Sequence, residues 1–172
     1  MKTVHIFTHT TIRIKAKTGA SGYVLALEKD GEIAKGINHI YITDKQTAQA
    51  ALLDAITKAV ARFREPVVLH IWTDEQLIAS AVTKLWVEKW ASEEFEGRKN
   101  ADEWREFLSI CRRKEIDIRG IWFHVKQPHQ YREWLRWECD KAIKEGNYGE
   151  RNQKHQSERH HGAPEQSAQR AG

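Results

Sequence analysis

Two aspartates and two histidines stand at positions of this 172-residue chain where their side chains could act on a substrate. Asp74 directly follows an apolar run that is typical of a buried strand, and Asp140 lies in the last segment with helical spacing. His9 closes a strand-like segment near the start of the chain, and His129 lies just before the last helical segment. Carboxylates can hold two hard cations, which together hydrolyse a phosphodiester, whereas imidazole favours softer ions such as zinc. The residue types are therefore consistent with metal-assisted hydrolysis.

Each of these residues also has a purely structural interpretation. Asp74 lies between a strand pattern and a helix pattern, where an aspartate often caps free backbone N–H groups. His9 either gives one nitrogen to a metal ion or only makes a hydrogen bond, and Asp140 is also consistent with an ordinary solvated acid on a helix. The sequence predicts an active centre around Asp74 and leaves the roles of its neighbours open.

Strand-like runs dominate the first part of the chain. Residues 4–9, 23–27 and 33–42 have strand patterns, and Lys29, Asp30 and Gly31 form a hairpin-turn signal between the last two. We therefore expect three short antiparallel strands before any helix.

A helix and a buried strand follow. Apolar residues recur at helical spacing from Ala48 to Phe63, Pro66 ends that helix, and residues 67–73 are almost continuously apolar. A last strand is expected over residues 116–126. Strand, helix and strand in this order predict a parallel crossover, and hence an α/β fold with a mixed sheet.

Several of these segments resemble type 1 ribonuclease H, and they occur in that family's order over residues 2–143. The most specific match is residues 69–78 (LHIWTDEQLI), which resemble the family's fourth strand and its Thr-Asp-Ser/Glu turn. Residues 4–9 (VHIFTH) resemble its first strand, and Gly22 and Tyr23 the start of its second. Residues 99–104 (KNADEW) and the final Cys139 and Asp140 match two further motifs.

The resemblance implies a ribonuclease H-like fold, with a five-stranded mixed sheet and helices on both faces. It assigns catalytic positions to Asp74 and Asp140, and it makes His129 the best candidate for the family's loop histidine. His9 stands where the family has its first acid, and Ala51 where the first helix carries its glutamate. The implied metal ligands are thus Asp74, Asp140 and His9, which predicts a weakened site for Mg²⁺ or Mn²⁺.

Contacts to nucleic acid are expected from the same resemblance and from the charge pattern. Thr47 takes the place of one of the family's paired asparagines, and Lys126 lies in the loop after the last strand. Arg132 and Arg136 flank Asp140 on the last helix, in an aromatic and basic segment suited to a nucleic acid or a protein. The net charge of +4 agrees with a nucleic-acid partner and does not prove one.

We therefore expect a divergent ribonuclease H-type protein that engages RNA–DNA hybrid or other duplex nucleic acid, with metal-dependent hydrolysis weak or absent. One alternative is an active hybrid endoribonuclease that uses His9, Asp74, His129 and Asp140. A second alternative is a pseudo-nuclease that serves as a protein-interaction module.

Composition predicts how the chain is organised. Residues 1–145 are expected to form one domain, because 40% of the residues in the chain are apolar and the length suits a single core. Residues 146–172 are polar and contain no large aliphatic side chain, which predicts a disordered tail. The chain has no apolar run of membrane-spanning length, so we expect no membrane association and a cytoplasmic location.

Overall fold

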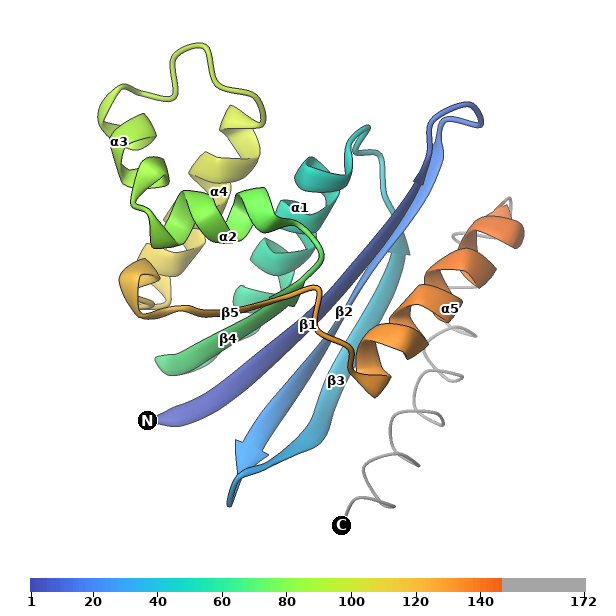
Figure 1. Cartoon of the computed structure of the whole chain (residues 1–172), viewed down its shortest axis with the longest axis horizontal. Helices are drawn as coiled ribbons and strands as arrows, with labels where there is room; N and C mark the ends of the chain where they lie inside the picture. The colour runs from blue at the N-terminus through green and yellow to red at the C-terminus, as the bar shows by residue number, and fades with distance from the viewer. Residues whose placement is uncertain (147–172) are drawn as a thin grey trace.

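Five strands form one mixed sheet in the computed structural model, which describes residues 1–146 (Figure 1). The strands lie in the order β3-β2-β1-β4-β5. Their bounds are β1 (Lys2–Arg13), β2 (Thr18–Lys29), β3 (Glu32–Ile42), β4 (Val67–Thr73) and β5 (Trp122–Val125). β2 is antiparallel to β1 and β3, whereas β4 is parallel to β1 and β5. The expected α/β fold with a five-stranded mixed sheet is confirmed.

Helices cover both faces of this sheet, as expected. They are α1 (Ala48–Val60), α2 (Gln76–Thr83), α3 (Trp86–Ser92), α4 (Ala101–Arg113) and α5 (Gln130–Lys144), with a short 3-10 turn, η1 (Ile118–Gly120). Neighbouring residues of β1 point to opposite faces, so Ile6 packs in the core with α1, α2 and α4 and Phe7 packs in the core with α5. Both side chains are fully buried. Strand alternation thus divides the core into two layers.

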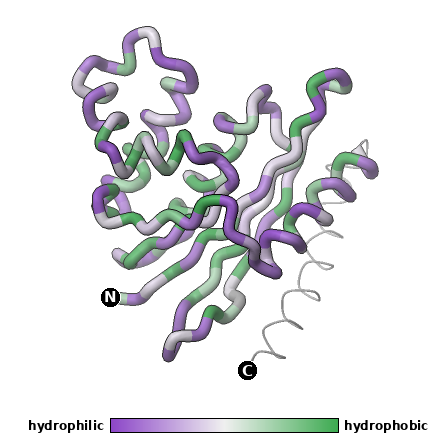
Figure 2. The backbone as a smooth tube through the Cα atoms, in the orientation of Figure 1, coloured by the Kyte–Doolittle hydropathy of each residue, from purple (hydrophilic) through white to green (hydrophobic). Residues whose placement is uncertain are grey.

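Hydropathy along the backbone follows this layering (Figure 2). The strands and the inner sides of the helices carry most of the hydrophobic residues, while the turn between α3 and α4 is mainly hydrophilic. None of the helices in residues 1–146 has the length and apolar character needed to cross a lipid bilayer. The tail predicted for residues 146–172 lies outside the described residues, apart from Gly146.

The last strand is shorter than expected. β5 begins only at Trp122, so the predicted start at residue 116 is wrong. Ile116 donates its N–H to the carbonyl of Cys111 at the end of α4, and the Asp117 side chain accepts from Arg119 N–H in η1. Because the backbone of residues 116–121 forms these turns, only the four residues of β5 pair with β4.

Within residues 1–146, one part of the sheet surface has no helix over it. α5 packs on β1, β2 and β3, while α2 lies against β5 and η1 and buries its residues Ile78 and Val82 in the core on the opposite face. The surface of β4 and β5 on the α5 side therefore carries exposed or half-buried side chains, among them Trp122, which is 62% exposed. This surface is called the open sheet face below.

Candidate active site

His9 and Asp74 meet at the end of two neighbouring parallel strands. In the register of β1 with β4, Phe7 lies opposite Trp72, and continuing this register by two residues places His9 opposite Asp74. The buried strand β4 ends at Thr73, so the chain leaves the sheet at Asp74, before α2 begins. The sequence prediction that Asp74 marks a functional edge thus has a clear geometric basis.

Asp74 forms an ion pair with an arginine of the same chain. Its Oδ1 atom forms an ion pair with the guanidinium of Arg132, which lies in the first turn of α5. Arg132 is only 7% exposed, and it also donates to the backbone carbonyl of Gln127. Its Nε has no hydrogen-bond partner within residues 1–146. Arg132, expected to face nucleic acid, is therefore turned inward onto Asp74.

Asp140 joins His9 through a threonine. The Thr11 hydroxyl donates to Asp140 Oδ1 at 3.4 Å, and His9 Nε2 lies 3.0 Å from the same hydroxyl oxygen. If the hydroxyl donates to Asp140, it accepts from His9, so Nε2 carries the proton and Nδ1 keeps a lone pair. Arg13 lies 3.9 Å from Asp140, and the Asp140 side chain is 42% exposed. The structure therefore brings His9 and Asp140 together, and their roles as metal ligands stay a prediction.

The charges around His9 act on it in opposite directions. Burial lowers the pKa of His9 below its usual value, Asp74 and Asp140 raise it, and Arg136 and Arg132 lower it further. Burial dominates, so the ring is neutral at neutral pH. A neutral ring can offer a single lone pair to a cation, whereas a carboxylate can bridge two.

His129 has a structural role that the sequence did not predict. It is the N-cap of α5, where its Nδ1 accepts from Tyr131 N–H at 3.1 Å. Its ring lies 4.2 Å from the Phe7 ring and 5.3 Å from the Trp72 ring. Burial, followed by the charges of His5 and Arg132, lowers the pKa of His129 to about 4. This histidine is a neutral hydrogen-bond acceptor whose catalytic role stays a prediction.

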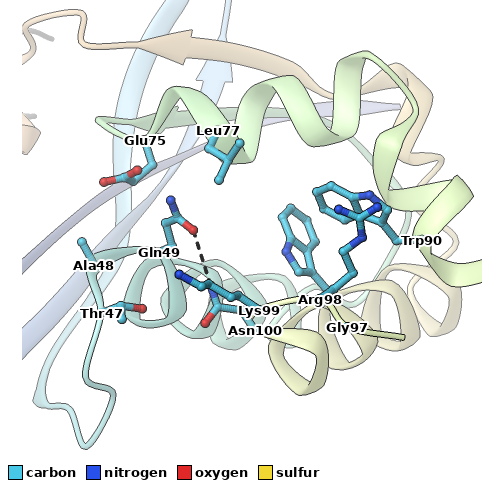
Figure 3. Close-up of a pocket in the computed structure, with 11 residues that line it drawn as sticks. Thr47, Ala48, Gln49, Glu75, Leu77, Trp90, Gly97, Arg98, Lys99 and Asn100 are labelled. Carbon is cyan, nitrogen blue, oxygen red and sulfur yellow. Dashed lines mark hydrogen bonds between the residues drawn. The ribbon is translucent and has the colours of Figure 1, made fainter. Parts of the chain in front are cut away.

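A groove lies beside this site (Figure 3). It has a volume of about 620 Å³, and its walls come from the start of α1, the start of α2 and the segment between α3 and α4. Thr47 lies at its rim and caps α1 by accepting from Ala50 N–H at 3.2 Å. Arg98 and Lys99 bring positive charge, and the Arg98 guanidinium lies 4.9 Å from the centre of the Trp90 ring. Such a groove could take a phosphate chain and stack a base.

The remaining predicted residues lie around this edge. Lys126 donates its backbone N–H to Thr73 O at 2.9 Å, so the loop that carries its exposed side chain runs beside the end of β4. Arg136 is exposed on α5 and pairs loosely with Glu133, 3.5 Å away. Ala51 is fully buried on α1 and offers no ligand.

Two features were missed at the sequence level. The ion pair of Asp74 with Arg132 joins residues 58 apart, and no local pattern marks it. The contribution of Arg98 to the groove was also missed, although its position directly before the matched KNADEW segment was a usable signal.

Comparisons with known proteins agree on one family. The family model described as RNase H matches residues 1–148. Ribonuclease H of Campylobacter jejuni (strain 81-176) is 28% identical over 93 residues, which cover 54% of this chain and 59% of that protein. The chain therefore matches little more than half the length of this relative.

Solved structures give the same fold. LC9-RNase H1, a type 1 RNase H with the type 2 active-site motif, superposes with a TM-score of 0.65 at 15% identity, covering 83% of this chain and 72% of that chain. The foamy viral protease-reverse transcriptase in complex with RNA/DNA hybrid gives a TM-score of 0.56 at 16% identity, over 79% of this chain and 18% of that one. At these identities the likeness concerns the fold.

Proposed function

Because the chain belongs to the ribonuclease H family, we propose that it engages RNA–DNA hybrid or other duplex nucleic acid, with metal-dependent hydrolysis weak or absent. The observation that carries the proposal of weak hydrolysis is the ion pair between the Arg132 guanidinium and Asp74. This pair lies where the pairing of β1 with β4 ends near His9 and Asp74, a part of the sheet that is called the active edge below. A relative that shares the fold, the foamy viral enzyme, has been solved with RNA/DNA hybrid, which supports the substrate class.

The residues present do not fit a pair of magnesium ions. A two-ion centre needs several carboxylates, at least one of them shared between the ions. Here Asp74 is neutralised by Arg132, His9 offers one lone pair in place of an acid, and the buried Ala51 offers nothing. Asp140 keeps a partly exposed carboxylate, and Arg13 lies 3.9 Å from it. These residues therefore do not supply the ligands of a two-magnesium centre.

Binding has better support than catalysis. The groove offers Arg98, Lys99 and the face of Trp90, and charged and stacking contacts of this kind are tolerant of sequence. Exposed Arg136 and Lys126 extend the positive surface along the active edge. Thr47 and Ala48 at the groove rim provide one hydroxyl and one methyl group, so selective contacts to the RNA 2′-hydroxyl are few. We therefore propose weak discrimination between hybrid and other duplexes.

A cleavage assay tests the catalytic half of the proposal. Labelled hybrid, duplex RNA and duplex DNA are incubated with the protein and Mg²⁺, and then with Mn²⁺. We expect little or no cleavage with Mg²⁺, and no loss of product when Asp74 is changed to Asn. Vigorous Mg²⁺-dependent cleavage of hybrid that Asp74→Asn abolishes would overturn the weak-hydrolysis proposal and favour the active endoribonuclease.

Fluorescence anisotropy tests the binding half. We expect dissociation constants of roughly 1–100 µM at physiological salt, falling at low salt because phosphate contacts release counterions. Arg98→Ala with Lys99→Ala should weaken binding and reduce the salt slope by up to about 1.8, since each lost phosphate contact contributes about 0.9. The matched control is Lys2→Ala with Lys29→Ala, which removes two exposed charges at the opposite end of the sheet. The absence of binding at low salt would leave the protein-interaction module as the better account.

A further inference from the structure

Three histidines from three adjacent strands lie together where the open sheet face meets β1. His5 lies on β1, His70 opposite it on β4, and His124 on β5 near Trp72. One ring nitrogen from each lies within 4.8 Å of the others. In Figure 1 these strands run side by side where α5 does not cover them. We propose that these three histidines form a binding site for one transition-metal ion of the Zn²⁺ type, separate from the candidate active site.

The spacing of the nitrogens suits one small ion. His70 Nδ1 lies 2.8 Å from His124 Nε2. Two imidazole nitrogens in a tetrahedral zinc shell lie about 3.3 Å apart, because each Zn–N bond is about 2.05 Å long. The closest pair must therefore open slightly, and the others, all within 4.8 Å, must close by at most about 1.5 Å, a change of the size that side-chain rotation supplies.

The protonation of the rings favours metal uptake. Burial, followed by the charges of His5 and His124, lowers the pKa of His70 to about 4, and burial also lowers the pKa of His5. Both rings are therefore neutral at neutral pH and hold a lone pair. His124 Nδ1 lies 3.4 Å from the amide oxygen of Gln127, which can only accept, so the proton sits on Nδ1 and the lone pair is on Nε2, where it accepts from His70 Nδ1 until an ion replaces that proton. His70 binds through Nδ1 once its proton moves to Nε2.

Glu28 supplies the outer contact that metal-bound histidines usually have. The Nε2 of His5 donates to Glu28 Oε1 at 3.0 Å, which holds the ring and leaves Nδ1 as the ligand atom. His5 is 2% exposed, so this ring is buried within the sheet surface. Without metal, His5 Nδ1 accepts from the indole N–H of Trp72 at 2.9 Å, and the ion must displace this hydrogen bond. Three imidazole ligands leave the fourth position of a tetrahedral shell to water.

The ion would join the short edge strand to the centre of the sheet. β5 has only four residues, and His124 is one of them. Binding to His5 and His70 at the same time ties β5 to β1 and β4, next to the loop that leads to α5. His5 and His9 are four residues apart on one strand, which is about 13 Å. His5 and His70, which pair with each other, therefore lie about 13 Å along the strands from the active edge at Asp74, and the inference does not rest on the proposed function.

The test is titration of the untagged full-length protein with Zn²⁺, and with Co²⁺ for its visible absorption. The background carries His155→Gln, His160→Gln and His161→Gln, so that the histidines near the C-terminus cannot contribute. We expect one ion per chain, a tetrahedral Co²⁺ spectrum and a change in tryptophan fluorescence as Trp72 loses its partner. At a hundredfold excess of Zn²⁺ over Kd, Tm should rise by about 5–10 °C.

Variants assign the ligands. His70→Gln and His124→Gln, both at partly exposed positions, should each weaken Zn²⁺ binding at least tenfold. Each removes a direct ligand, and the loss of an outer contact alone already costs about 10–100-fold in metal affinity. His39→Gln on β3 is the matched control, and Asp74→Asn should leave Zn²⁺ binding unchanged, which separates this site from the active edge. The absence of binding, or affinity that is retained in either His70→Gln or His124→Gln, would overturn the site.

Discussion

Replacing Arg132 with glutamine would remove the positive charge that lies on Asp74. The Asp74 side chain is 43% exposed, so water can solvate it once the ion pair is lost. The loss of a fully buried pair partner costs about 3–5 kcal/mol, and we expect a smaller cost of about 1–2 kcal/mol here because one partner stays hydrated. Arg132→Gln should therefore stay folded.

The same change should let Asp74 bind a divalent cation more tightly. An ion bound to this carboxylate would lie about 4 Å from the guanidinium, and charges of +2 and +1 at that distance repel by about 2 kcal/mol even at the dielectric constant of water. Removing the repulsion should raise the affinity for Mg²⁺ at least about 30-fold.

Amide chemical shifts near Asp74, followed by NMR as Mg²⁺ is added, measure this affinity. Mg²⁺ is used because imidazole is a poor ligand for it, so the three-histidine cluster should not bind the added ion. Arg136→Gln is the matched control, since it removes the same charge from an exposed side chain that does not touch Asp74. Equal Mg²⁺ affinities for wild type and Arg132→Gln would refute the idea that this guanidinium excludes the cation.

Two further predictions concern catalysis and pH. Combining Arg132→Gln with His9→Asp and Ala51→Glu should create Mg²⁺-dependent cleavage of hybrid. Because Ala51 is fully buried, the glutamate should lower Tm in the absence of Mg²⁺, and Mg²⁺ should restore it. Cleavage that needs no Mg²⁺ would count against this design. His129 and His70 both have a pKa lowered to about 4 in the folded protein, mainly by burial. A histidine in the unfolded chain has a pKa of about 6.5, so between about pH 6.5 and pH 4 the unfolded chain binds more protons than the folded one. Their contribution to stability is thus complete above about pH 6.5 and is lost as pH falls through this window, by about 2–4 kcal/mol in total after allowing for solvent screening. Urea unfolding at pH 7.5, 5.5 and 4.5 measures the loss, and His129→Asn with His70→Gln should flatten it, since Asn keeps the N-cap acceptor.

The sequence alone determined the order of the elements and the position of Asp74 at the end of a buried strand. Strand alternation, helical spacing and Pro66 are local signals, so the three antiparallel strands, α1 and the buried β4 could be read from them. Asp74 was placed at the end of β4 because it follows a near-continuous apolar run that is typical of a buried strand. The mixed sheet followed from the order of these segments, and its ribonuclease H-like form was implied by the family resemblance.

Only the tertiary structure decided which charges meet at the active edge. Arg132 reaches Asp74 because α5 starts beside the end of β4, and that placement depends on how a helix packs across the sheet. His5 and His70 face each other because β1 and β4 pair in one particular register, since a shift by one residue would turn one of the rings to the other face. Periodicity tells which face of its own element a residue takes, and it carries no information about the partner, because pairing is set by contacts between segments far apart in the chain.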